Sequence, residues 1–143
     1  MHEQDKIEEA RYFISMMRVT QADYKKTVFN LSAATTAARS ALQYALKEAE
    51  ARDKLNGRSW YDSATKADNT IKFFKDKRDL NIHEEPITSN KDVIVHVGEV
   101  PVATHHYWFP DWQGQEDVIT LCERYLDAVS ALVADGKSQA FLG

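Results

Sequence analysis

The sequence has 143 residues, of which 43% are hydrophobic and 28% are charged. These are the values of a globular domain, and they argue against an intrinsically disordered chain. The formal net charge of −4 lowers the expectation of a DNA-binding module, because proteins that coat nucleic acid usually carry a basic surplus.

Cysteine usage and the amino-terminal residues indicate the compartment. Cys122 is the single cysteine of the sequence, so no intrachain disulfide can form, and a reducing compartment is expected. Residues 1–6 contain no basic region followed by an apolar run, which argues against a signal peptide. Nowhere do about 18 apolar residues follow one another, so no membrane span is predicted. We therefore expect a cytoplasmic protein.

Hydrophobic residues recur at helical spacing in four segments. The predicted helices cover about residues 5–18, 22–54, 59 to before Pro86, and 115–134. Asn56-Gly57 and Asp135-Gly136 are expected to end the second and fourth helices, and Ser59 is the expected N-cap of the third. The small residues of segment 32–40 favour close packing or a dimer seam. The sequence thus predicts one all-α domain over residues 1–143, an up-and-down four-helix bundle.

A β-branched segment and an aromatic loop separate the third and fourth predicted helices, at about residues 92–114. Residues 92–104 predict a hairpin with Gly98 and Glu99 in its turn, and Pro101 must then lie at an edge or unpaired position. The loop that follows is rich in aromatic and imidazole rings, namely His105, His106, Tyr107, Trp108, Phe109 and Trp112. Because a two-stranded hairpin is marginal alone, it is expected to lean on the bundle.

An arginine interrupts the apolar stripe of the third predicted helix. The stripe consists of Trp60, Ala64, Ala67, Ile71 and Phe74, and Arg78 occupies its next position. Asp79 follows directly, and His83 comes after four intervening residues. This segment resembles the HEPN superfamily, whose members are four-helix domains with an arginine, four to six residues, and then a histidine. Many of them carry a polar residue directly after the arginine.

The resemblance implies a metal-independent endoribonuclease that acts as a homodimer, with paired motifs lining a shared cleft. It implies a setting in defence or stress, with an antitoxin as a candidate protein partner. RNA cleavage by 2′-OH attack needs proton transfer, which suits His83, and a cation over the phosphate, which suits Arg78. Asp79 would orient one of the two. No metal and no other cofactor is expected.

The spacing of this pair limits how it can work. Five helical residues amount to about 500°, so Arg78 and His83 do not share a face of a continuous helix. Either the helix unwinds after Arg78, or the two residues converge across a two-fold axis. Lys75 and Lys77 are candidate phosphate contacts, and Trp108 is a candidate stacking platform for an RNA base.

Structural roles explain the same residues without catalysis. Arg78 would pair with a carboxylate from another helix, and His83 would favour the C-terminal dipole of its helix. Glu84 and Glu85 place negative charge beside the motif, and Glu85 stands where one HEPN subgroup has a tyrosine. The rival interpretation is therefore a non-catalytic helical protein that binds a protein partner through its aromatic loop. His96, His105 and His106 do not show a recognised metal-ligand spacing.

Overall fold

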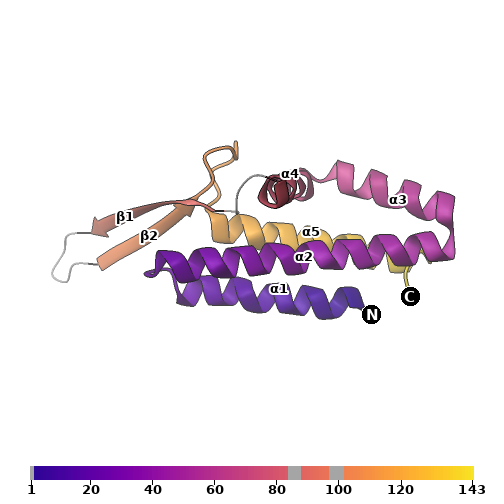
Figure 1. Ribbon diagram of the computed structural model, residues 1–143, viewed down its shortest axis with the longest axis horizontal. Coiled ribbons are helices and arrows are strands. Elements are labelled where there is room, and N and C mark those ends of the chain that lie inside the picture. The colour runs from indigo at the N-terminus through magenta and orange to yellow at the C-terminus, as the bar shows by residue number, and fades with distance from the viewer. Residues whose placement is uncertain (1, 84–87, 97–101) are drawn as a thin grey trace.

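The computed structural model describes residues 2–83, 88–96 and 102–143, except for the side chains of residues 78–83, 96 and 102 (Figure 1). Its elements are α1 (His2–Val19), α2 (Tyr24–Arg52), α3 (Lys54–Ala67), α4 (Asn69–His83), β1 (Asn90–His96), β2 (Val102–Trp108) and α5 (Val118–Ser138). The chain is mostly helical, and its hairpin lies between the helix that bears the motif and the last helix. Both features confirm the prediction.

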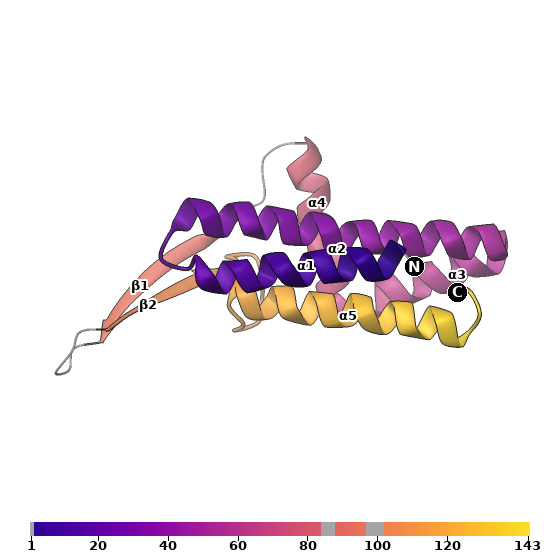
Figure 2. The ribbon, with the colours of Figure 1, turned by 90° about the horizontal axis from the view of Figure 1, so that it is seen from below.

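Three long helices run alongside one another, and two shorter ones complete the helical part (Figures 1 and 2). The antiparallel pair α1 and α2 packs against α5. The shorter α3 returns along α2, whereas α4 crosses the long helices and is seen end-on in Figure 1. The hairpin extends from the end of the molecule opposite α3.

The prediction of four helices is corrected to five within the described ranges, because the third predicted helix is in fact α3 and α4. Asp68 separates them in an extended conformation, with φ −109° and ψ 120°. Its carboxylate accepts hydrogen bonds from the backbone N–H groups of Thr70 (2.9 Å) and Ile71 (3.0 Å) and from the Thr70 hydroxyl. Asp68 thus satisfies the first donors of α4 and redirects the chain.

The boundary between α2 and α3 also differs from the prediction. Asp53 alone links the two helices, and its carboxylate accepts from the backbone N–H of Asn56 at 3.2 Å. Asp53 is therefore the N-cap of α3, whereas Ser59 lies inside the helix. Gly57 does not end α2 but lies in α3, where a Cβ atom would meet the Ala49 carbonyl. Glycine is needed there because the two helix backbones approach closely.

The last helix is longer than predicted, because Gly136 continues it instead of ending it. A Cβ atom at Gly136 would lie 2.6 Å from the Trp60 ring and 2.7 Å from the Leu142 side chain. Trp60 donates from its indole N–H to Asp135 at 2.7 Å and stacks on Phe141 at 5.4 Å. The hydrogen bond from Trp60, followed by that from Gln139, lowers the pKa of Asp135. The glycine thus makes room for a tryptophan.

The strands extend beyond the predicted hairpin at both ends. They pair antiparallel from Asn90↔Trp108 to His96↔Val102, so residues 105–108 belong to β2 and not to a loop. The predicted turn, Gly98 and Glu99, and the neighbouring Pro101 lie outside the described residues. At its base the hairpin leans on the helices, because the hydroxyl of buried Tyr107 donates to the Gln21 carbonyl at 2.6 Å.

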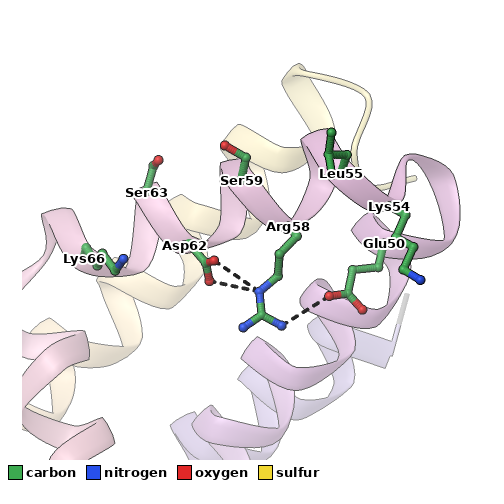
Figure 3. Close-up of a pocket in the computed structure, with 8 residues that line it drawn as sticks. All are labelled: Glu50, Lys54, Leu55, Arg58, Ser59, Asp62, Ser63 and Lys66. Atoms are coloured by element: carbon green, nitrogen blue, oxygen red, sulfur yellow. Dashed lines mark hydrogen bonds and ion pairs between the residues drawn. The ribbon is translucent and has the colours of Figure 1, made fainter.

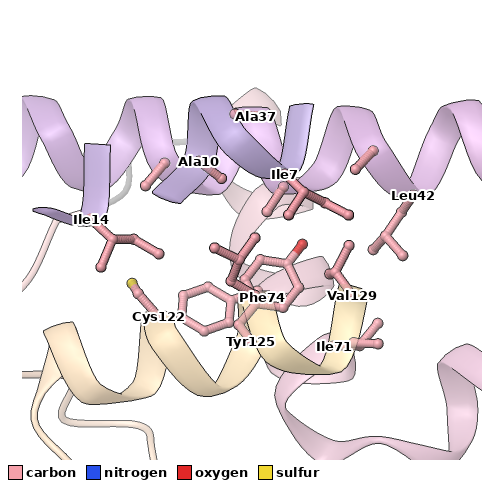
Figure 4. Close-up of a cluster of buried hydrophobic side chains, with 14 of the residues drawn as sticks. Ile7, Ala10, Ile14, Ala37, Leu42, Ile71, Phe74, Cys122, Tyr125 and Val129 are labelled. Carbon is pink, nitrogen blue, oxygen red and sulfur yellow. The ribbon is translucent and has the colours of Figure 1, made fainter. Parts of the chain in front are cut away.

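The hydrophobic core lies between α1, α2, α4 and α5 (Figure 4). Alanines dominate the buried side of α2, which lets neighbouring helices approach it closely. Larger side chains from the other helices fill the centre, among them Ile7, Ile14, Ile71, Phe74, Tyr125 and Val129. Cys122 is also in this cluster, and burial raises the pKa of its thiol. Of the small residues predicted as close-packing positions, Ala34, Ala37 and Ala38 are buried in the interior of this chain.

Membrane insertion of a helix finds no support in the described ranges. None of the helices there is both long and apolar enough to cross a bilayer.

Gly57→Ala is expected to destabilise the protein by more than about 1 kcal/mol, although alanine is the better helix former by about that amount. The new Cβ atom would force the α3 backbone away from the Ala49 carbonyl. Urea denaturation measures the change in the free energy of unfolding. Ser59→Ala, at an exposed position of the same helix, is the matched control and is expected to change it by less than about 0.5 kcal/mol. Equal effects of the two substitutions would contradict the close-approach argument.

Candidate functional site

The motif singled out by the sequence lies in the C-terminal part of α4. This helix is continuous from Asn69 to His83, so it does not unwind after Arg78. The side chains of Arg78, Asp79 and His83 lie outside the described residues, and their roles stay predictions. Positions 78 and 83 are about 140° apart around the helix axis and about 7.5 Å apart along it. A single α4 therefore does not place the two positions on one face.

The surroundings of α4 leave its C-terminal end clear of the long helices. The helix contacts α2, α3 and α5. In Figure 2 its C-terminal end projects past α2, away from α1 and α5. The motif, which lies in the C-terminal part of α4, is therefore on the projecting side of the helix.

Aromatic packing anchors the first half of α4. Phe74 is buried and stacks on Tyr125 of α5, with ring centroids 4.5 Å apart and planes at 15°. Phe73 contacts Phe109 at 5.4 Å and Trp112 at 5.1 Å between centroids. Stacked and edge-to-face rings at these separations are favourable beyond their buried area. The aromatic loop thus covers the helix that carries the motif.

Lys77 is the last residue before the motif whose side chain is described. Its ammonium group lies 2.9 Å from the Asp111 carboxylate, and its side chain is 16% exposed. The same group lies 5.1 Å from the centre of the Phe109 ring and 5.6 Å from that of Phe73. Its charge is therefore held by a carboxylate and two ring faces. Neither the ion pair nor Asp111 was anticipated from the sequence.

The other two candidate substrate contacts have different surroundings. Lys75 is exposed on the same helix. Trp108, at the base of the hairpin, donates its indole N–H to Asp92 at 3.0 Å. The structure therefore brings Lys75 and Lys77 together with the motif on α4, while Trp108 lies on a separate element and already has a carboxylate partner.

A cleft of about 360 Å³ lies beside Trp108, between the hairpin base and the start of α5. Asp92, His106, Trp112 and Glu116 are among its lining residues. Glu116 accepts from the Trp112 indole N–H at 2.6 Å and pairs with Arg124 at 2.5 Å. The Trp112 hydrogen bond is the main cause of a lowered pKa of Glu116. Two carboxylates, those of Asp92 and Glu116, line this cleft, which disfavours phosphate there.

One residue pair of this cleft, Trp112 and Glu116, was recognisable in the sequence although it was not predicted. Trp112 and Glu116 stand four residues apart in the loop just before the last helix, so an indole donor and a carboxylate acceptor are close together along the chain. Such a pair ties an aromatic loop to the helix that follows it.

The histidines and the acidic residues of the described ranges contain no group of three or more that suits a metal ion. His105 and His106 are both partly buried neighbours on β2, and the Nδ1 atom of His105 is buried without a hydrogen-bond partner. Successive residues of a strand point to opposite faces, so the two imidazoles do not converge.

A wider groove of about 580 Å³ lies at the far end of the molecule, between α2 and α3 (Figure 3). Arg58 lies at its centre and donates to Asp62 (3.2 Å) and to Glu50 (3.3 Å). These hydrogen bonds, with Asp62 first, raise the pKa of Arg58. Because both carboxylates hold this guanidinium, the groove lacks a free arginine for phosphate and does not include the motif of α4.

Comparison of the chain with protein-family models, with curated proteins and with solved structures finds no significant match. The motif and the geometry of α4 therefore remain as indications of function.

Phe74→Ala is expected to cost about 3–5 kcal/mol of unfolding free energy, because it removes a buried ring from the contact between α4 and α5. Denaturation in urea, followed by circular dichroism, measures the loss. Lys75→Ala changes the exposed neighbour and is the control, with an expected effect within about 0.5 kcal/mol. A similar loss for both variants would show that α4 is not anchored by its aromatic side.

Proposed function

We propose that this protein is a metal-independent endoribonuclease of the HEPN type that acts as a homodimer. RNA would be cleaved by attack of the 2′-OH on the adjacent phosphate. The observation that carries the proposal is the Arg78-Asp79-x3-His83 motif on one continuous helix, whose first half is locked by aromatic packing. A rigid helix is a suitable support for catalytic side chains, since small displacements reduce rates strongly.

Each residue of the motif has a distinct chemical task in this proposal. The Arg78 guanidinium binds the phosphate oxygens and stabilises the charge that builds up on them during attack. His83 transfers protons, either from the attacking 2′-OH or to the leaving 5′-oxygen. Asp79 orients one of these two side chains. None of these tasks uses a metal ion.

The separation of about 140° between positions 78 and 83 supports a composite site. In a two-fold dimer, position 78 of one chain can approach position 83 of its partner, and two equivalent sites result. Arg78 and His83 then act on the same phosphate although they project from different sides of their own helix.

The charges described around α4 rank the candidate phosphate contacts. Lys75 is exposed on α4, whereas Lys77 is already paired with Asp111. A solvated lysine can release counterions from RNA, while an ion-paired one must first give up its carboxylate. Lys75 is therefore the stronger candidate for a phosphate contact. Trp108 would stack a base only in the cleft that Asp92 and Glu116 line.

Wild-type protein is expected to cleave a mixed-sequence RNA in the presence of EDTA. Arg78→Ala should lower the rate by about 10²–10³-fold, since it removes the charge over the phosphate. His83→Ala should lower it by about 10²–10⁴-fold, since it removes the proton-transfer group. Gel analysis of end-labelled RNA measures both rates.

Two substitutions of the same residue types elsewhere are the controls. Arg58→Ala lies in the groove between α2 and α3, and His2→Ala lies at the start of α1. Both should retain wild-type cleavage once folding and oligomeric state are matched. Equal activity in all variants would assign the cleavage to a contaminant or to another site. No cleavage by the wild type would favour the non-catalytic interaction protein.

Mixing the inactive variants tests whether the site is composite. Subunit exchange between Arg78→Ala and His83→Ala chains should restore about a quarter of wild-type activity, because half of the dimers are mixed and each has one intact site. A site contained in one chain would give no recovery. The readout is the cleavage rate of the mixture after exchange, compared with the two variants alone.

A further inference from the structure

The outer half of the hairpin exposes an uncharged apolar segment. Val93, Ile94 and Val95 of β1 are 52%, 51% and 58% exposed. In both ribbon views the outer half of the hairpin lies beyond the ends of the helices (Figures 1 and 2). Three consecutive β-branched residues in such a position are unusual, because exposed apolar strands are templates for pairing with another chain.

The backbone of β1 is also incompletely paired within the described residues. The sheet there has two strands, so β1 bonds to β2 along one edge only. A two-stranded hairpin is marginal in water, and three or more strands with an apolar face are needed for independent stability. The base of the hairpin is held at Tyr107, which donates to the Gln21 carbonyl, whereas Val93, Ile94 and Val95 are each more than half exposed.

The sequence of β1 matches itself in antiparallel pairing. With a two-fold axis at Ile94, Ile94 lies opposite Ile94 of a second copy, and Val93 lies opposite Val95. The facing pairs between positions 93 and 95 are then all apolar, so no like charges meet among them. Both copies contribute the same edge, as an isologous contact requires.

Neighbouring registers fit less well. An axis at Asp92 would place two aspartates opposite each other, which is unfavourable. An axis at Val93 would pair Asp92 with Ile94 and would bring the base of the strand, beside the helices, into the contact. The strand β2 is a poorer edge, because its centre carries Ala103, Thr104 and His105.

We propose that β1 pairs with β1 of a second copy of this chain about an axis at Ile94, giving a four-stranded antiparallel sheet in the order β2-β1-β1-β2. Alternation places Val93 and Val95 of both copies together on one face, beside their hairpin partners His105 and Ala103. Because one short strand of each copy takes part, we expect a contact smaller than a standard interface of about 1,200–2,000 Å² and a weak dimer, with a dissociation constant of about micromolar order. It does not depend on nuclease activity.

Ile94→Lys tests the position of the axis. Two ammonium groups would lie directly opposite each other, and the dissociation constant should rise more than tenfold. Thr104→Lys is the matched control. Thr104 is the partner of Ile94 within the hairpin, so this substitution adds the same charge on the same face of the sheet but away from the free edge of β1. Sedimentation equilibrium from about 1 to 200 μM measures both, and circular dichroism verifies folding.

Ile94→Cys provides a second test that does not depend on weakening the contact. Opposite residues of antiparallel strands have Cα atoms about 4.5–5.5 Å apart, within the range of a disulfide. Mild oxidation should cross-link this variant, and Thr104→Cys should remain uncross-linked. The native Cys122 is buried and does not compete.

The outcomes separate this contact from other assemblies. A dimer that Ile94→Lys dissociates and Ile94→Cys cross-links supports the pairing, whether or not RNA is cleaved. A wild-type monomer at 200 μM, well above the expected dissociation constant, would overturn it and leave the strand for a different partner. A dimer that keeps its mass in Ile94→Lys and fails to cross-link in Ile94→Cys would overturn it too, and would place the interface elsewhere.

Discussion

The break at Asp68 determines how the rest of the molecule is arranged. Without it, α3 and α4 would form one straight helix along α2, and Phe73 and Phe74 would not reach α5. The carboxylate of Asp68 takes the hydrogen bonds that a continuing helix would have given to its carbonyls. The chain can then turn, and α4 crosses the long helices with its aromatic residues against Tyr125 and the loop around Phe109. The loop, the start of α5 and the projecting end of α4 all depend on that crossing.

Helical periodicity was sufficient to predict most elements, but not the places where side chains override it. The long helices, the hairpin and the apolar residues Ile71 and Phe74 were predictable because burial imposes a repeat on the sequence. The break at Asp68 was missed, and the break at Asp53 was placed a few residues too late. An aspartate in a polar helix face has the same sequence pattern whether or not it caps a backbone. Gly57 and Gly136 were misread as helix ends, because their role depends on a neighbour that is distant in the sequence.

The candidate site was predictable only as a set of positions. The sequence placed Arg78, Asp79 and His83 on one helix, and α4 is that helix. It gave no indication that Lys77 pairs with Asp111 or that Glu116 binds the Trp112 indole, since both contacts join a helix to a loop whose course the sequence does not specify. The carboxylates near the aromatic loop neutralise cations and hold indole N–H groups. An RNA substrate would therefore be disfavoured at the cleft beside Trp108.

Two parts of the molecule, the motif on α4 and the outer half of β1, would need different kinds of contact with a second chain. The motif on α4 separates its residues around one helix, so a partner would supply a charged side chain and the contact would be sensitive to salt. The outer half of β1 is paired with β2 along one edge only and exposes Val93, Ile94 and Val95. A partner strand would pair the other edge and cover these side chains with little dependence on ionic strength. The two contacts lie on separate elements, and an assembly that used both would grow beyond a dimer unless their two-fold axes coincide. Coincident axes would require the end of α4 and the hairpin to face the same partner. The position of the strand contact would then determine which chain completes the proposed nuclease site.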